Sequence, residues 1–141
     1  MNTVTVVGNI TRDTELRFFD SGSVVNTSIA VNESFKAKNG EWKETVVFLD
    51  LSIWENAGAE NVAGCLKKGD RVLVTGKLKM NQWKTDTGEN RSKIELTVAE
   101  IGPTMKWAEV DITKNEKKAG SGAYNSGGSA PQSYTSDEPE F

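Results

Sequence analysis

Hydrophobic and polar residues alternate along much of the first 113 residues, with the period of two that is typical of β-strands burying one face. The pattern is clearest over residues 47–54, where Val, Leu and Ile at odd positions are separated by Phe, Asp, Ser and Trp at even positions. It predicts strands over residues 3–10, 24–31, 45–54, 71–80 and 92–101, and a last short strand over residues 105–112.

Turn signals separate several of these strands. Asp-Ser-Gly at residues 20–22, Asn-Gly at 39–40 and Asp-Thr-Gly at 86–88 favour tight turns, because Gly and Asn tolerate positive φ angles. Between the third and fourth strands the alternation stops, and Val62, Cys65 and Leu66 recur with helical spacing. We therefore expect one short helix there, ended by Gly69, with Cys65 as a small core residue.

The expected element order is three strands, one helix and two strands. It is the order of an all-β oligonucleotide/oligosaccharide-binding (OB) fold, a five-stranded Greek-key barrel, although other small β-barrels share it. After residue 113 the chain is rich in Gly, Ser, Asn and Pro, a composition that cannot bury enough apolar surface to order itself. We expect a folded domain over residues 1–113, a disordered linker over 114–136 and an acidic tip over 137–141.

The composition restricts the chemistry. The 141 residues include 17 Lys and Arg against 20 Asp and Glu, so any binding of a polyanion must use local patches and not bulk charge. With no His and one Cys, an internal disulfide and a Cys/His zinc site are excluded, and we expect no metal or cofactor. The N-terminal MNTVTVVGNI has neither a basic start nor a long apolar run, so we expect a soluble cytoplasmic protein with no membrane partner.

One predicted hairpin, residues 76–93, concentrates positive charge. It has five bases against two acids, whereas residues 1–113 have 14 bases and 16 acids. Alternation places one set of side chains in the core: Val72, Val74, Leu78, Met80, Ile94, Leu96 and Val98. It leaves a second set facing solvent: Lys77, Lys79, Trp83, Arg91 and Lys93, with Lys84 next to Trp83. This hairpin is thus expected to present cations around an exposed indole.

Cations around an aromatic platform suit a single strand of nucleic acid, because the cations contact phosphates and the ring stacks on a base whatever its identity. Phe48 and Trp54 also point outward, on the strand that contains Asp50, whose charge repels phosphate. In the alternative interpretation, Lys on a strand edge only discourages aggregation, and Trp54 packs under the helix.

The loop NESFKAKNGEWK, residues 32–43, adds aromatic and basic side chains to this picture. It contains Phe35 and Trp42 together with Lys36, Lys38 and Lys43. We expect Phe35 and Lys36 to take part in the same surface.

Four stretches of the sequence resemble the bacterial and bacteriophage single-stranded DNA-binding proteins. They are VTVVGNITRDTELRF at 4–18, VVNTSIAVNESF at 24–35, NVAGCLKKGDRVLVTGKLK at 61–79 and WKTDTGENRSKIELTVAEIG at 83–102. The resemblance implies an OB barrel that assembles as a homotetramer and binds single-stranded DNA without sequence preference or enzymatic activity.

The resemblance also implies functional residues. The base-stacking aromatics of the family correspond to Phe35, Phe48, Trp54 and Trp83, with Phe at the first two positions where Trp is usual. Basic positions of the family correspond to Lys68, Lys79 and Arg91, whereas Asp50 and Asn56 stand where the family has two basic contacts. Residues 100–112 resemble a branch in which an extra terminal strand clamps subunits together.

The last residues, Ser-Asp-Glu-Pro-Glu-Phe, resemble the tip by which family members bind replication and repair proteins. The corresponding residues are Asp137, Glu138, Pro139, Glu140 and Phe141. Such a tip offers an aromatic ring to a pocket and anions to a basic rim. Glu140 departs from the family pattern, because it separates Pro139 from the terminal Phe141.

Two other functions remain open from the sequence. A related barrel that binds RNA, or a primosome or annealing accessory protein, has the same pattern, and competition between DNA and RNA oligomers separates these cases. An enzyme is disfavoured, because the chain has no His, Asp50 has no acidic partner at a useful spacing, and no glycine loop has the phosphate-binding form.

Overall fold

The structure, a computed structural model, describes residues 1–116, and Met1–Val110 form one compact unit. The expected linker from residue 117 onward and the expected tip, residues 137–141, lie outside the described residues. The strands are β1 (Val4–Ile10), β2 (Leu16–Phe19), β3 (Gly22–Lys36), β4 (Trp42–Trp54), β5 (Arg71–Lys84) and β6 (Asn90–Pro103). A 3-10 turn, η1 (Glu55–Ala57), and one helix, α1 (Ala59–Cys65), lie between β4 and β5.

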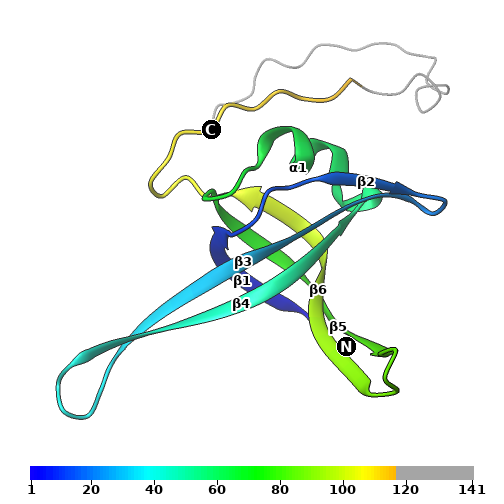
Figure 1. Cartoon of the computed structure of the whole chain (residues 1–141). Coiled ribbons are helices and arrows are strands. Elements are labelled where there is room, and N and C mark those ends of the chain that lie inside the picture. Colours follow the sequence, from blue (N-terminus) through cyan, green and yellow to red (C-terminus); the bar gives the residue numbers. More distant parts are fainter. Residues whose placement is uncertain (117–141) are drawn as a thin grey trace. The chain divides into compact units, whose positions relative to one another are not determined.

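The strands form a closed barrel (Figure 1). Their order in the sheet is β1-β5-β6-β4-β3-β2, and β1 also pairs with β3 through Asn9 and Ile10, which closes the barrel. Paired strands are antiparallel except β4 and β6, which run parallel at Asp50, Leu51 and Ser52. The five-stranded OB barrel with one helix, expected from the sequence, is confirmed, and β2 extends it as a short strand paired with β3.

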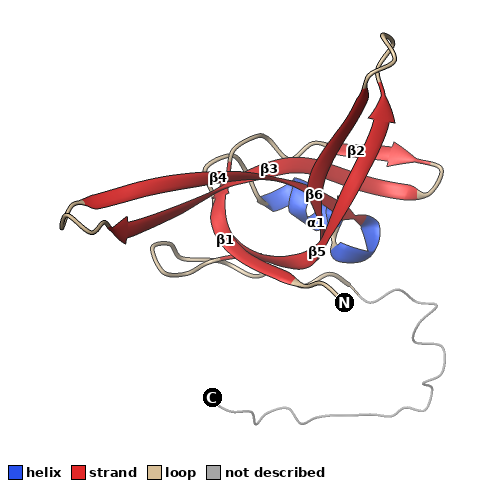
Figure 2. Ribbon diagram, turned by 90° about the horizontal axis from the view of Figure 1, so that it is seen from below, coloured by secondary structure: helices blue, strands red, loops and turns tan. Residues whose placement is uncertain are grey.

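The hydrophobic core fills the barrel and reaches α1, which lies across one end of it (Figure 2). The strands β1, β3, β4, β5 and β6 each contribute buried residues on one side, as the alternation predicted. The helix α1 adds two residues, and Leu66 directly after it adds a third. The core consists of Ile10, Val25, Ile29, Leu51, Ile53, Ala59, Val62, Leu66, Val72, Val74, Leu96 and Val98.

Two hairpins continue beyond the barrel as two-stranded arms (Figure 2). β3 and β4 stay paired as far as Lys36 and Trp42, and β5 and β6 as far as Lys84 and Asn90. The predicted turns are confirmed, since Gly40 and Gly88 adopt positive φ angles of 87° and 89° at the two arm ends. The four strands are therefore longer than the alternation of buried positions indicated.

The arms explain three wrong core predictions. Leu78, Met80 and Ile94 were expected in the core, yet they are 39%, 52% and 52% exposed. They do lie on the inward-facing side of β5 and β6, but on the part of the hairpin that has left the barrel. Alternation reports the side of a strand on which a residue lies, and burial also requires a second layer to cover that side.

The prediction that Cys65 is a core residue is also wrong, because Cys65 is exposed. It is the last residue of α1, whose buried side is formed by Ala59 and Val62, with Leu66 buried immediately after it. Gly69 does not end the helix either, since Leu66 is the C-cap residue. Gly69 has a φ angle of 97° and donates its backbone N–H to the Ile10 carbonyl, so it shapes the turn that leads into β5.

Two further differences concern short segments. Residues 105–112 were expected to form a strand, but they contain no regular structure, and Met105, Trp107 and Ile112 are 70%, 73% and 82% exposed. β2 was not expected, because only four residues form it and none of them is fully buried, so no alternation marks it.

Candidate nucleic-acid interface

The outward side chains of β4, β6 and β5 form one continuous surface, which we name the outer face. Asp50 and Ser52 pair with Glu95 and Thr97 across β4 and β6, and β6 continues the register into β5. Paired residues of neighbouring strands point to the same side of a sheet. The outer face therefore comprises Phe48, Asp50, Ser52 and Trp54 of β4, Arg91, Lys93, Glu95 and Thr97 of β6, and Lys77, Lys79, Asn81 and Trp83 of β5.

Trp54 and Lys77 line one hollow of the outer face. The hollow has a volume of about 500 Å³ and is also lined by Ser21, Asn56 and Thr97. Trp54 is partly buried and pairs with Val24 of β3, so the barrel holds it in place while part of the side chain stays accessible. An aromatic side chain and an ammonium group thus line the same open hollow.

Trp83 and Arg91 lie opposite each other on β5 and β6, on the arm that these strands form. Trp83 is 47% exposed, and the pair lines an open hollow of about 430 Å³ together with Gln82, Lys84 and Ser92. The Arg91 Nη2 atom lies 3.1 Å from the Glu89 Oε2 atom, but both side chains are more than half exposed. Water screens such a pair, so the guanidinium group of Arg91 remains accessible to another anion.

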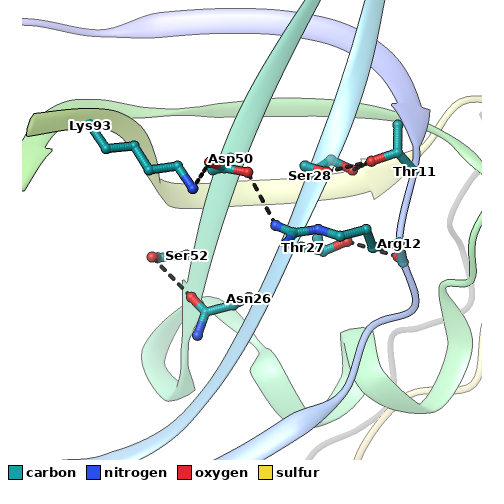
Figure 3. A network of polar contacts seen from close by, with 8 residues as sticks. All are labelled: Thr11, Arg12, Asn26, Thr27, Ser28, Asp50, Ser52 and Lys93. Carbon is teal, nitrogen blue, oxygen red and sulfur yellow. Dashed lines mark hydrogen bonds and ion pairs between the residues drawn. The ribbon is translucent and has the colours of Figure 1, made fainter.

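Asp50 lies on the outer face and forms ion pairs with two cations, Arg12 and Lys93 (Figure 3). Its Oδ1 atom is 3.1 Å from Nη2 of Arg12, and its Oδ2 atom is 2.5 Å from Nζ of Lys93. The Arg12 carbonyl accepts a 2.8 Å hydrogen bond from the Thr27 hydroxyl, which fixes the backbone beside the outer face. The negative charge expected to oppose binding is therefore compensated by neighbouring cations.

The β3–β4 arm displays the other two expected aromatic residues, Phe35 and Phe48, together with Trp42. Phe35, Trp42 and Phe48 are 48%, 70% and 71% exposed. Lys36 pairs with Trp42 across the arm, and both lie on the side that continues from Phe48. Phe35 is one residue away from Lys36 and points to the opposite side of this ribbon, so the structure does not place it with Phe48.

Two expected basic residues lie off the outer face. Lys84 follows Trp83 and points to the other side of the arm, although it borders the same hollow. Lys68 lies in the turn between α1 and β5, beside the Gly69 N–H that donates to Ile10. Neither residue shares a strand face with Lys77 and Lys79.

Sequence reasoning missed three exposed residues near this region. Arg12 follows β1 in a segment without alternation, and only the tertiary structure places it against Asp50 of β4. Phe18 and Phe19 are 73% and 56% exposed on β2. The sequence did contain a signal for this exposure, because Phe18 and Phe19 are adjacent and neighbouring residues of a strand point to opposite sides. In a sheet with one buried side, one of the two rings must therefore be exposed.

Fold and surface together define the class of protein: an OB-fold barrel whose outer face combines cationic and aromatic side chains. Within residues 1–116, no helix is long and apolar enough to span a membrane.

Comparison with known proteins gives the family. A model of the single-strand binding protein family matches residues 1–104. A single-stranded DNA-binding protein of Paenarthrobacter aurescens is 46% identical over 129 residues, which are 89% of this chain and 75% of the relative. The corresponding protein of Mycobacterium leprae is 44% identical over 121 residues, which are 84% of this chain and 71% of that relative. The chain belongs to the single-strand binding protein family.

Solved structures agree on the fold. The chain is similar to the Plasmodium falciparum SSB, solved in complex with ssDNA, with a TM-score of 0.66 and 20% identity over 74% of this chain and 95% of that one. It is also similar to a small single-stranded DNA-binding protein from Streptomyces coelicolor, with a TM-score of 0.62 and 24% identity over 74% of this chain and 94% of that one.

Proposed function

We propose that this protein coats and protects single-stranded DNA without sequence preference, as a binding protein and not an enzyme, in the bacterial cytoplasm. The observation that carries the proposal is the outer face, where Trp54 and Trp83 share one surface with Lys77, Lys79 and Arg91. The family membership supports the same function.

The chemistry of the outer face suits a flexible single strand better than a duplex. Lys and Arg side chains contact phosphates, and indole rings stack on bases, which are accessible only when they are unpaired. Stacking contributes about 1–3 kcal/mol per base and accepts every base, because each has a π-face. The contact residues proposed on the outer face and its continuation are Lys36, Phe48, Trp54, Lys77, Lys79, Trp83, Arg91 and Lys93. Phe35, Lys68 and Lys84, which lie off this face, are proposed as further contacts.

Titration with oligo-dT, followed by tryptophan fluorescence, tests the proposed function. We expect quenching, because stacked bases change the surroundings of Trp54 and Trp83, and an affinity that falls as salt rises. Each phosphate contact on a single strand adds about −0.7 to the slope of log K against log salt, so three to five contacts give a slope of roughly −2 to −3.5.

Competition experiments decide between the remaining ligands. Single-stranded DNA is expected to displace labelled oligo-dT, whereas a duplex of the same length is expected to compete poorly. Equal or better competition by RNA would support the related RNA-binding or accessory role instead. Failure to bind any single strand would refute the proposed function.

A homotetramer is part of the proposal and is supported by the uncovered inner side of the β5–β6 arm. Met80 and Ile94 pair across the arm, and with Leu78 they expose an apolar strip that a second chain can cover. Light scattering is expected to give the mass of four chains of 15.4 kDa. Met80→Glu should lower that mass, because a carboxylate in an apolar contact loses its hydration, whereas Asp86→Asn at the exposed end of the same arm should not.

The acidic tip, residues 137–141, is proposed to recruit replication, recombination and repair proteins. The support is chemical: Phe141 offers an aromatic ring to a pocket, and Asp137, Glu138 and Glu140 offer anions to a basic rim. Pro139 lies between Glu138 and Glu140 in this sequence and is part of the proposed tip.

A further inference from the structure

Asp50 occupies the middle of the outer face, between the two proposed stacking groups. Phe48 and Trp54 flank it on β4, and Glu95 of β6 is its partner in the register. The carboxylate is mostly covered, with 24% of the side chain exposed, while its partners Arg12 and Lys93 are 55% and 53% exposed. Asp50 and Glu95 therefore form a row of two acidic side chains across a face whose other charged residues are cations.

The two acids of this row have different partners. Asp50 contacts two cations from separate parts of the chain, Arg12 after β1 and Lys93 on β6 (Figure 3). Glu95 instead accepts a 2.8 Å hydrogen bond from the Asn81 side chain. Asp50 is thus the acid that engages cations which a DNA phosphate would otherwise contact.

We propose that Asp50 is a built-in competitor of DNA phosphate for Arg12 and Lys93. In the free protein the carboxylate holds both cations at the centre of the outer face. A single strand that crosses this row must take one or both cations from Asp50, or pass with its phosphates elsewhere. Asp50 thereby weakens binding and reduces its salt dependence, and Arg12 becomes a DNA contact that the strand patterns did not reveal.

The exposure of the two cations makes this exchange feasible. Arg12 and Lys93 are each more than half exposed, so water can solvate both cations as they leave the carboxylate. Arg12 and Lys93 can therefore turn from the carboxylate to a phosphate without unfolding any strand. The Thr27 hydroxyl, which holds the Arg12 carbonyl, keeps the backbone of Arg12 beside the face during the exchange.

The inference rests on the proposed function and is tested with the full chain and the variant Asp50→Asn. Asparagine keeps the size of the side chain and removes its charge. If one or both cations become free for phosphate, the slope of log K against log salt should steepen by about 0.7 or 1.4, respectively. The affinity for oligo-dT at about 0.1 M salt should then rise roughly five- to 25-fold.

The control variant is Glu60→Gln, which removes the same charge from the exposed surface of α1, away from the strands of the outer face. It should leave the affinity and the slope within about two-fold and about 0.3 of the wild-type values. An equal gain in this control would mean that net charge, and not the position of Asp50, controls binding.

A second background separates release of the cations from removal of repulsion. In the variant Arg12→Gln/Lys93→Gln, adding Asp50→Asn should raise the affinity by less than about two-fold, because no cation is left to release. An undiminished gain there, or no gain from Asp50→Asn in the wild-type chain, would overturn the inference. If the wild-type protein binds oligo-dT and Asp50→Asn leaves the affinity and the salt slope unchanged, only the inference is refuted. If the wild-type protein does not bind oligo-dT, the proposed function itself is refuted.

Discussion

Replacing Trp83 by alanine is expected to weaken oligo-dT binding roughly five- to 150-fold, since one stacked base contributes about 1–3 kcal/mol. Trp83 is 47% exposed and lies opposite Arg91, so a base can reach the indole while its phosphate meets the guanidinium group. The loss should persist at high salt, because stacking releases no counterions. The dissociation constant measured over a range of salt concentrations, with tryptophan quenching as the signal, checks this prediction.

Trp107→Ala is the matched control for that experiment. Trp107 is 73% exposed, and the side chains of Arg71 and Lys106 lie 4.5 Å and 4.9 Å from its ring centre, so it too combines an indole with cations. It lies after β6, outside the outer face, and its removal should leave the affinity within about two-fold. Comparable losses in both variants would show that exposed tryptophan in general, and not the β5–β6 arm, provides the binding.

Replacing Gly76 by alanine is expected to destabilise the barrel by about 3 kcal/mol, a strong case of overpacking. An added Cβ atom would lie 2.1 Å from the carbonyl oxygen of Thr97, a backbone atom of the neighbouring strand. The close approach arises at a β-bulge, where the register of β5 and β6 shifts between Thr75 and Gly76. Because the nearest atoms, from Thr97 and Val98, all belong to the backbone, the two strands must separate to make room for the Cβ atom.

Thermal unfolding measures this effect, and a loss of about 3 kcal/mol should lower the Tm of a domain of this size by more than about 10 °C. Gly102→Ala on β6 is the control, since an added Cβ atom there meets nothing within 4 Å among the described residues. Its Tm should change by less than about 3 °C, given the small cost of glycine substitutions on open strand surface. A Gly76→Ala protein as stable as the wild type would show that the bulge can relax without opening the pair.

Particular residues show how far the sequence leads toward the candidate site. The alternation over β5 and β6 placed Lys77, Lys79 and Trp83 on one side, and the register of the structure confirms this. The same reasoning could not combine them with Trp54, because pairing between β4 and β6 joins residues about 45 positions apart in the chain. Such pairing depends on closure of the barrel, which no local pattern reports.

The pairing of Asp50 illustrates the same limit for charges. From the sequence, Asp50 was an isolated negative charge on an aromatic strand, and it counted against the surface. The fold brings Arg12 from the segment after β1 and Lys93 from β6 to its two oxygen atoms. The effect of a charge depends on which charges surround it, and the two cations around Asp50 come from two other segments of the chain.

Side-chain alternation and turn chemistry are local properties, so the amino-acid sequence was sufficient to predict the inward side of each long strand and the turns at Gly40 and Gly88. The order of the elements and the family resemblance gave the class of fold. Tertiary structure alone decided where burial ends, so that Leu78, Met80 and Ile94 became exposed when their hairpin left the barrel. It also decided that Cys65 lies outside the core and that Asp50 is held by two cations. Burial and charge compensation require a second segment of chain, and the position of that segment is fixed only when the barrel closes.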